Sequence, residues 1–445
     1  MTTGGHKPNR WIRRHFHGVG YILIVLLVGA NMPSPLYGAY REAFGFSPVM
    51  QTVIFAVYAA ALVPALLVFG PLSDAIGRRP VLSLALLFGV LGATLMACAD
   101  STSWLMAGRI AQGLSVGTCS AAGAAALAEH EPDGDHTKAA TAATATTAVG
   151  AALGPLFAGA LAQYLPHGFV LPYLVFLCTL VPALVAVALL PASRGHGRGT
   201  RPKIRISLPR VPHTIRAPFT IAVSTSAVSW AVVGLFQAVV PSWITEMTGT
   251  GNLVVGGSAA ALTMVCSAAT QLSVRRLPPR LGQRLGLVLL AVGMLILLLA
   301  NLLHSLPLLF VTTAVTGVGH GLAFSGGMQQ VNGVLVTEAP EVRGSVLAAL
   351  YTIVYAGLGV PVIAVGLLIT LQGMDAAVVE FSLAAVAACV VIMIAQRRAA
   401  RRTLSASRVI AGSPMADRPG TVAASSAGDI APQGAGPDAR RDPIG

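Results

Sequence analysis

Residues 51–82 of the chain read QTVIFAVYAAALVPALLVFGPLSDAIGRRPVL. The first part of this stretch, 51–72, contains no charged residue and is long enough as a helix to cross ~30 Å of hydrocarbon. A short polar segment with Asp74, Arg78 and Arg79 follows, and a second apolar stretch begins at residue 80. This alternation predicts two membrane-spanning helices that are joined by a tight, charged loop.

The same pattern recurs along the chain. Of its 445 residues, 55% are hydrophobic and 10% are charged, with a mean hydropathy of +0.74, whereas soluble domains carry about a quarter charged residues. Apolar surface this extensive has to face lipid. The sequence therefore predicts an all-α membrane protein of about twelve transmembrane helices, at roughly 17–38, 51–72, 80–99, 104–127, 139–163, 169–191, 217–241, 253–274, 285–303, 306–333, 345–371 and 377–396.

Lys and Arg residues gather on one side of this predicted topology. All but two of the 29, Arg41 and Arg109, fall in the segments on the same side as the N-terminus. The positive-inside rule then predicts a multi-pass protein of the cell (inner or plasma) membrane with both termini in the cytoplasm. The net charge of +13 is thus a signal of topology. A nucleic-acid role would need a basic face on a folded domain, and the sequence indicates none.

The cysteines indicate neither a metal site nor a disulfide framework. All five lie inside apolar stretches without CxxC spacing, so we expect small buried hydrophobic residues and no cofactor; they are Cys98, Cys119, Cys178, Cys266 and Cys389.

The chain is predicted to consist of two related halves. We expect a cytoplasmic N-terminus at 1–16, an N-terminal six-helix bundle at 17–192, a cytoplasmic linker at 193–216, a C-terminal six-helix bundle at 217–396 and a disordered cytoplasmic tail at 397–445. The halves resemble each other at an offset of about 208 residues, which aligns Pro33-Ser34 with Pro241-Ser242, Gly113-Leu114 with Gly321-Leu322, Pro132 with Pro340 and, after a short slip, Pro155 with Pro361. Duplicated halves place a substrate site at their interface near the membrane midplane.

The loop after the second span carries the sharpest motif, Gly70-Pro-Leu-Ser-Asp74-Ala-Ile-Gly77-Arg78-Arg79-Pro-Val-Leu82. It resembles the G-x-L-[AS]-D-x-x-G-R-[KR]-x-x-L signature of the major facilitator superfamily, whose members are twelve-helix transporters built as two six-helix bundles. The resemblance implies that this motif holds the two halves together in one conformation and releases them in the other. Gly70 permits close helix approach, Gly77 permits a tight turn, and Arg78 and Arg79 anchor the loop on the cytoplasmic side.

The loop departs from the family pattern at Ala75, where a basic residue is common. The Asp74 network is therefore expected to use other partners. Glu129 and Glu131, at the end of the fourth span, are candidates to pair with Arg78 or Arg79, and the alternative is that they are solvated loop charges.

The fourth span contains Gly108-Arg109-Ile-Ala-Gln112-Gly113, which resembles the family's R-x-x-Q-G element. An arginine within the bilayer costs ~2.5–3.5 kcal/mol on insertion scales, so Arg109 should face a cavity or a partner. The resemblance implies a role in proton coupling or substrate contact. The alternative is a structural arginine that is satisfied by helix carbonyl groups.

The fifth span contains Gly150-Ala-Ala-Leu-Gly154-Pro155-Leu-Phe-Ala-Gly159. It resembles the GxxxGPxxGG element of the exporter branch of the family, with Ala158 in place of one glycine. Small residues at this spacing allow close helix contact, and Pro155 bends the helix. The resemblance implies export.

The family lines its cavity with spans one, four, seven and ten. Helical periodicity places Arg109 and Gln112 on one face of span four, Trp230 and Gln237 on one face of span seven, and His320 on the equivalent face of span ten. For each residue alone, a structural hydrogen bond between helices is the simpler interpretation; for the set, we expect a substrate and coupling site. No Asp or Glu lies near the centre of any span, which favours a neutral, amphipathic or anionic substrate over a cation, and His320 is the candidate titrating group.

These observations predict a proton-coupled efflux carrier that moves a small compound, a drug or a metabolite, by alternating access and acts as a monomer. Uptake of a sugar or metabolite is the alternative within transport. A membrane enzyme or sensor is the alternative outside it, but no catalytic constellation, nucleotide loop or soluble sensor domain is evident in the sequence.

Overall fold

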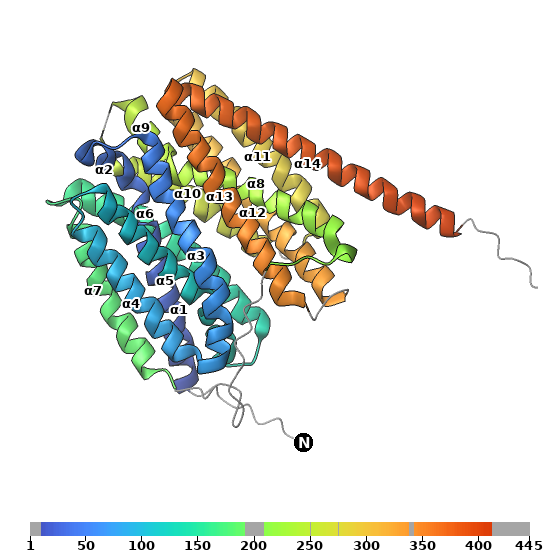
Figure 1. Ribbon diagram of the computed structural model, residues 1–445, viewed down its shortest axis with the longest axis horizontal. Helices are drawn as coiled ribbons and strands as arrows, with labels where there is room; N and C mark the ends of the chain where they lie inside the picture. Colours follow the sequence, from blue (N-terminus) through green and yellow to red (C-terminus); the bar gives the residue numbers. More distant parts are fainter. Residues whose placement is uncertain (1–9, 192–208, 250, 275, 338–341, 412–445) are drawn as a thin grey trace, which may run out of the picture. The chain divides into compact units, whose positions relative to one another are not determined.

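The computed structural model describes residues 10–191, 209–249, 251–274, 276–337 and 342–411, and this part of the chain contains helices and no strand. The helices, shown in Figure 1, are α1 (Arg10–Asn31), η1 (Ser34–Leu36), α2 (Tyr37–Phe44), α3 (Pro48–Ile76), α4 (Arg78–Ala97), α5 (Thr102–Glu129), α6 (His136–Tyr164), α7 (Leu171–Leu189), η2 (His213–Ile215), α8 (Arg216–Ala238), α9 (Val240–Thr248), α10 (Leu253–Ser273), α11 (Pro279–Leu302), α12 (Leu306–Thr337), α13 (Arg343–Gln372) and α14 (Met374–Ala411).

Twelve helical segments in the described part of the chain are long and apolar enough to cross a membrane, which confirms the predicted number. The first is broken near its end, where α1 gives way to η1 and α2, and α8 gives way to α9 in the same manner. The first break contains Pro33-Ser34, and the second, at Val239, lies two residues before Pro241-Ser242 in the first turn of α9. Because proline lacks an N–H donor and clashes with the preceding turn, each pair bends the chain at the end of a span.

Helix boundaries follow local capping chemistry. Gly77 separates α3 from α4 with a φ of 97°, a conformation that a side chain would strain, so the loop turns within a single residue. The side chains of Ser47, Asp135 and Asn252 accept backbone hydrogen bonds at the starts of α3, α6 and α10.

The internal repeat is visible in the packing of the glycine pair Gly113 and Gly321. A Cβ on Gly113 would lie 2.9 Å from Cβ of Ala61 on α3, and a Cβ on Gly321 would lie 2.8 Å from Cβ of Thr270 on α10. In both halves, therefore, the fourth helix presses its backbone against the second. The other loop match, Pro132 with Pro340, cannot be compared because Pro340 lies outside the described residues.

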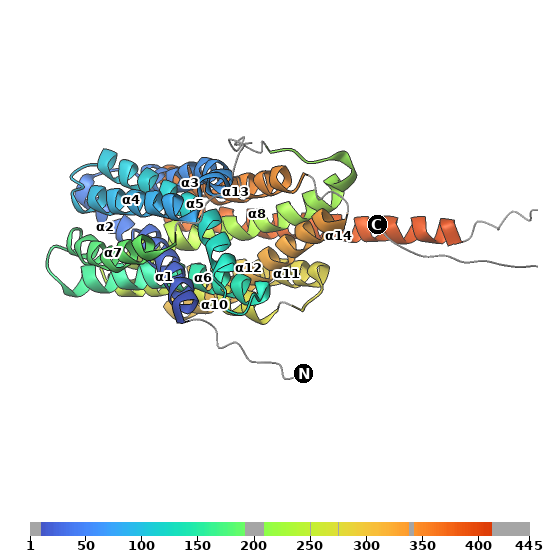
Figure 2. The same ribbon diagram turned by 90° about the horizontal axis from the view of Figure 1, so that it is seen from below.

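The halves meet along two helix pairs, α3 with α13 and α6 with α10, which lie side by side in Figure 2. Gly257 of α10 approaches the fifth-span proline closely, since a Cβ there would lie 2.6 Å from the Pro155 carbonyl oxygen. Gly359 of α13 is in ordinary contact distance of Ala56 on α3. The two inter-half seams thus use equivalent helices, as a duplicated fold requires.

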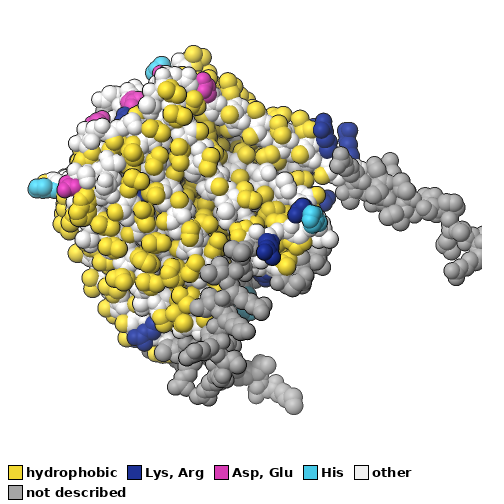
Figure 3. All heavy atoms as spheres, viewed as in Figure 1, with side chains coloured by type: hydrophobic (Ala, Val, Ile, Leu, Met, Phe, Trp, Pro, Cys, Tyr) yellow, Lys and Arg dark blue, Asp and Glu magenta, His cyan; other side chains and the backbone are white. Residues whose placement is uncertain are grey.

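The surface is apolar over the span regions. Leu87, Leu91, Val360 and Leu371 each expose about half or more of their surface, and apolar side chains cover most of the face drawn in Figure 3. A water-soluble protein would not expose apolar area on this scale, so these side chains face lipid.

The last helix continues beyond the predicted end of its bundle. α14 runs to Ala411, so residues 397–411, assigned from the sequence to a disordered tail, are helical. The reason is composition: this segment is rich in Ala and Arg, which are strong helix formers. Residues 412–445, and most of the predicted linker (193–208), lie outside the described residues.

Candidate functional site

Arg109 lies on α5 and is almost completely buried, with 2% of its surface exposed. One terminal nitrogen (Nη1) donates to the carbonyl oxygen of Ala30 at 2.7 Å and to Oε1 of Gln112 at 2.8 Å. The guanidinium also lies 4.4 Å from the ring centroid of Tyr58, a cation–π geometry. The arginine is therefore held by protein groups from α1 and α3, away from lipid, while its Nε has no hydrogen-bond partner among the described residues.

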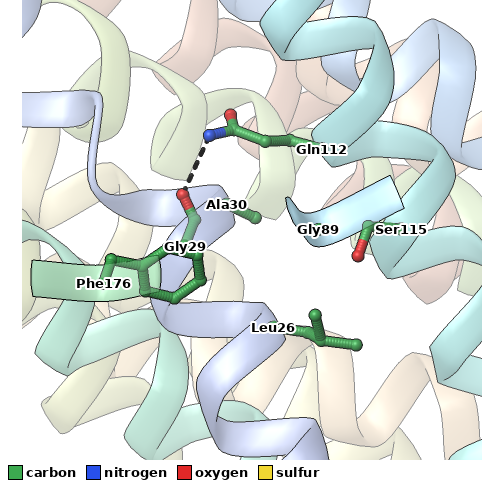
Figure 4. A pocket seen from close by; sticks show the side chains of 7 residues that line it. All are labelled: Leu26, Gly29, Ala30, Gly89, Gln112, Ser115 and Phe176. Carbon is green, nitrogen blue, oxygen red and sulfur yellow. Dashed lines mark hydrogen bonds between the residues drawn. The ribbon is translucent and has the colours of Figure 1, made fainter. Parts of the chain in front are cut away.

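Gln112 completes this arrangement by donating from Nε2 to the carbonyl oxygen of Gly29 at 3.1 Å, as Figure 4 shows. It lines a cavity of about 10 Å³ together with residues of α1, α4, α5 and α7, namely Leu26, Gly29, Ala30, Gly89, Ser115 and Phe176. Such a volume is about that of one water molecule. The cavity is too small for a substrate. It leaves room for about one water molecule next to Gln112, the hydrogen-bond partner of the buried arginine.

In the C-terminal half, His320 lies at the centre of an aromatic cluster. Its ring centroid is 5.1 Å from that of Trp230 and 5.7 Å from that of Phe324, and Tyr355 packs against Trp230 at 5.7 Å. Nδ1 of His320 is 2.6 Å from Oγ of Ser267, whereas Nε2 of His320 and Nε1 of Trp230 are buried without a hydrogen-bond partner among the described residues. Buried donors and acceptors without partners are uncommon, and they commonly mark functional sites.

Gln237 on α8 contacts the other half directly. Its Nε2 donates to Oδ1 of Asn31 on α1 at 3.4 Å, and its backbone carbonyl accepts a short hydrogen bond from Oγ of Ser34. Asn31 follows the two α1 residues whose carbonyl groups bind Gln112 and Arg109. The end of α1 is thus contacted from both halves.

The structure brings the predicted residues together in two groups. Arg109 and Gln112 form one group with α1, and Trp230 and His320 form the other within the C-terminal half. Among the described residues, no hydrogen bond or ring contact joins the two groups directly. Gln237 lies between the halves and is linked to the first group through α1.

Sequence reasoning missed the residues that receive these side chains: Asn31, Tyr58, Ser267 and Tyr355. Asn31 carried a usable signal, because it is a polar residue in an apolar span directly before Met32-Pro33. The others are ordinary residues of membrane helices, and only the packing reveals their role.

The loop motif forms an ion-pair network inside the N-terminal half. Arg78 binds Oδ1 of Asp74 at 2.5 Å and Oε1 of Glu129 at 2.9 Å, so the predicted pairing with Glu129 is confirmed. The other candidate, Glu131, pairs with neither arginine among the described residues: its carboxylate accepts hydrogen bonds from the backbone N–H groups of Asp133 and Asp135 in the loop before α6. Arg79 donates to the carbonyl oxygen of Leu190, the residue that follows α7. Gly70 and Gly77 occupy the predicted helix contact and turn, with a Cβ on Gly70 3.4 Å from Ala121.

The fifth-span motif contacts both halves. A Cβ on Gly150 would lie 2.7 Å from the carbonyl oxygen of Ile24 on α1, and a Cβ on Gly154 would lie 2.6 Å from that of Val28. A Cβ on Gly159 would lie 2.7 Å from the carbonyl oxygen of Leu253 at the start of α10. These glycines therefore let α6 pack closely against α1 on one side and the C-terminal half on the other, with Pro155 inside the helix between them.

Contacts between the halves are concentrated at the end of the bundle where α1 and α8 stop. Arg41 of α2 binds Glu246 of α9 at 2.7 Å, and Nε2 of Gln51 on α3 donates to the Ala238 carbonyl oxygen at 2.8 Å and to Ser242 Oγ at 3.1 Å. At the opposite end, the described partners of the loop motif all belong to the N-terminal half.

Comparisons with known proteins agree on one family. Residues 19–364 match the family model described as Major Facilitator Superfamily. Two similar proteins are Multidrug resistance protein MdtL of Klebsiella pneumoniae (strain 342), 33% identical over 98 residues, and Inner membrane transport protein YnfM of Escherichia coli (strain K12), 34% identical over 95 residues. Those matches cover 22% and 21% of this chain, and the chain spans only about a quarter of the length of each relative (25% and 23%).

Solved structures show the same fold. A bacterial homologue of the human lysosomal transporter Spinster, in an inward-facing and unoccupied conformation, aligns with a TM-score of 0.65 at 15% identity. The alignment covers 88% of this chain and 96% of that one. The occupied inward-facing structure gives the same TM-score at 16% identity.

Proposed function

This chain belongs to the major facilitator superfamily and is a membrane transporter for small molecules, not an enzyme, and we propose that it exports a neutral, amphipathic or anionic compound in exchange for protons. The observation that carries the proposal is the buried Arg109. It is the one Lys or Arg within the predicted spans, its Nε has no hydrogen-bond partner among the described residues, and it lies beside α1 where the two halves meet.

The substrate class follows from charge. No carboxylate lies near the centre of any span, so the site offers a cation no buried counter-charge. Arg109 attracts a negative or electron-rich group, and the aromatic cluster around His320 offers apolar faces with two unpartnered nitrogens. A small amphipathic molecule that spans both groups fits this chemistry.

Alternating access is supported by where the halves hold each other. Their polar contacts lie at the α2 and α9 end, and the loop motif at the other end is paired within its own half. We assign the α2 and α9 end to the outer face of the cell membrane. The Lys and Arg residues gather at the opposite end, and the positive-inside rule therefore places that end and both termini in the cytoplasm. The conformation is then closed to the outside, and the transporter acts as a monomer.

The Gly-Pro element of α6, which packs against both α1 and α10, favours export over uptake. The name of the MdtL relative, which matches 22% of this chain, also favours export. The choice of proton as coupling ion rests on His320 and Arg109.

The test is transport by the purified protein in proteoliposomes with an imposed pH gradient, against a panel of neutral, anionic and cationic compounds. We expect compound to move against the direction of proton entry, with cations moved least. Solute movement that ignores the pH gradient would remove proton coupling, and movement with the protons would replace export by uptake.

A further inference from the structure

A second cavity lies between α1 and α7, away from the candidate transport site. It has a volume of about 210 Å³ and lies at the ends of these helices that adjoin the Arg-rich segments 1–16 and 193–216. Its lining residues come from these two helices alone: Arg14, His15, Gly18, Pro182, Val185, Ala186 and Leu189.

One wall of this cavity is cationic and polar. Arg14 is exposed and forms no ion pair within the described part of the chain. His15 is only 6% exposed, yet its Nε2 has no hydrogen-bond partner among the described residues. Buried nitrogens without a partner are uncommon in native proteins, so His15 gives this wall a polar group that the described residues leave unsatisfied.

The opposite wall is apolar and faces lipid. Leu189 and Val185 of α7 expose 62% and 53% of their surface. A cationic side chain beside exposed apolar side chains, at the end of a membrane helix, matches the two parts of a phospholipid, since basic pockets between helices on the cytoplasmic side bind anionic headgroups.

We propose that the cavity between α1 and α7 is a binding site for one anionic phospholipid of the cytoplasmic leaflet. Arg14 pairs with its phosphate, His15 lies beside the headgroup, and its acyl chain lies along Val185 and Leu189. The bound lipid fixes α1, the helix whose far end supplies the carbonyl groups that hold Arg109 and Gln112. The site does not depend on what the protein transports.

Trp11 makes this site measurable, because its ring lies edge-on against that of His15 at 4.1 Å between centroids. The full chain in detergent is titrated with phosphatidylglycerol or phosphatidylcholine carrying brominated acyl chains, which quench nearby tryptophan fluorescence. The Trp11 signal is the difference between the unaltered protein and Trp11→Phe. We expect phosphatidylglycerol to quench Trp11 at a several-fold lower concentration than phosphatidylcholine.

The neighbouring arginine provides a matched control. Arg14→Gln is expected to weaken the phosphatidylglycerol effect by about fivefold, the contribution of one basic residue near a membrane surface, whereas Arg13→Gln, which is equally exposed but does not line the cavity, should leave it nearly unchanged. Ala186→Leu fills the cavity without changing charge and should abolish the preference for phosphatidylglycerol.

Three results would overturn the proposal. Equal quenching by both lipids would remove the headgroup preference, and equal weakening by Arg13→Gln and Arg14→Gln would reduce it to diffuse surface attraction. Full reversal of quenching by inorganic phosphate at constant ionic strength would reassign the site to a free anion.

Discussion

The third helix of each half, α4 and α11, follows a junction with the preceding helix, and the two junctions are held by different chemistry. At the start of α4, Arg78 forms ion pairs with Asp74 and Glu129. At the start of α11, Gln283 instead donates to Gln330 at 2.5 Å and contacts Gln396 at 3.4 Å.

Exposure differs as sharply as charge. The Asp74 and Glu129 side chains are 70% and 39% exposed, whereas Gln283 is completely buried. Exposed ion pairs contribute about 0–1 kcal/mol each and can exchange partners readily, while a buried amide network is costly to break. We interpret the N-terminal junction as the one that changes partners during transport and the C-terminal junction as a fixed one.

The centres of the spans show the same contrast. Gln112 and His320 are related by the internal repeat, but Gln112 serves a buried arginine whereas His320 lies among aromatic rings. The repeat has kept the backbone packing, seen at Gly113 and Gly321, and has let the polar chemistry diverge. As a result, the N-terminal half supplies the charge of Arg109, and the C-terminal half supplies the aromatic surface around His320.

Removing the central charge should produce the largest effect. In Arg109→Ala, transport is expected to fall by at least about tenfold, because hydrogen bonds to charged groups contribute about 1.5–3 kcal/mol each. Flux in proteoliposomes is measured beside the yield of monodisperse protein, which should be retained. Near-normal flux would make Arg109 a structural residue that helix carbonyls merely satisfy.

His320→Gln tests the aromatic cluster of the C-terminal half. If His320 takes part in proton exchange, this variant should lose the pH dependence of transport while it still binds compound, and Ser267→Ala should shift that dependence less. Flux is recorded across a pH series for all three proteins. An unaltered pH profile in His320→Gln would remove the histidine from the coupling mechanism.

The shared frame is tested by Gly113→Ala and Gly321→Ala. Each new Cβ would overlap the neighbouring helix, and overpacking costs about 1–3 kcal/mol. Both variants should therefore lower the unfolding temperature by similar amounts in the same detergent. A large loss in one and none in the other would contradict the equivalence of the two contacts.

The two junctions should respond differently to a matched loss of polar contacts. Gln283→Leu is expected to lower thermal stability in a way that salt does not change. Arg78→Gln should alter stability least of all these variants, within about 1 kcal/mol because its carboxylate partners are exposed, but should change transport rate. Equal stability losses for the two variants would erase the distinction between a changing and a fixed junction.

Most of the fold could be predicted because its signals are local. The spans follow from uninterrupted apolar length, the two breaks from Pro33-Ser34 and Pro241-Ser242, and the loop network from Arg78 with a nearby acid. The helical extension to Ala411 was missed because a segment too polar to pack into a core can still form a helix when it is rich in Ala and Arg.

The conspicuous polar side chains of the site were predictable, and the groups that they contact were not. Arg109, Gln112 and His320 are conspicuous because polar groups are expensive within a membrane span. Their partners are the Ala30 and Gly29 carbonyl groups and the Ser267 hydroxyl, which carry no such signal. Contacts between residues far apart in sequence, such as Gln237 with Asn31, depend on how the halves pack, which no local pattern specifies.

We propose that the halves separate at the α2 and α9 end during each transport cycle. A Cβ on Gly38 of α2 would lie 3.5 Å from the Cβ of Ser242 on α9, within the range of a disulfide. Gly38→Cys with Ser242→Cys, in a protein whose five native cysteines are replaced, is oxidised and assayed in proteoliposomes beside each single variant. We predict that oxidation stops transport and that reduction restores it; undiminished transport by the fully cross-linked protein would show that the halves do not separate at this end.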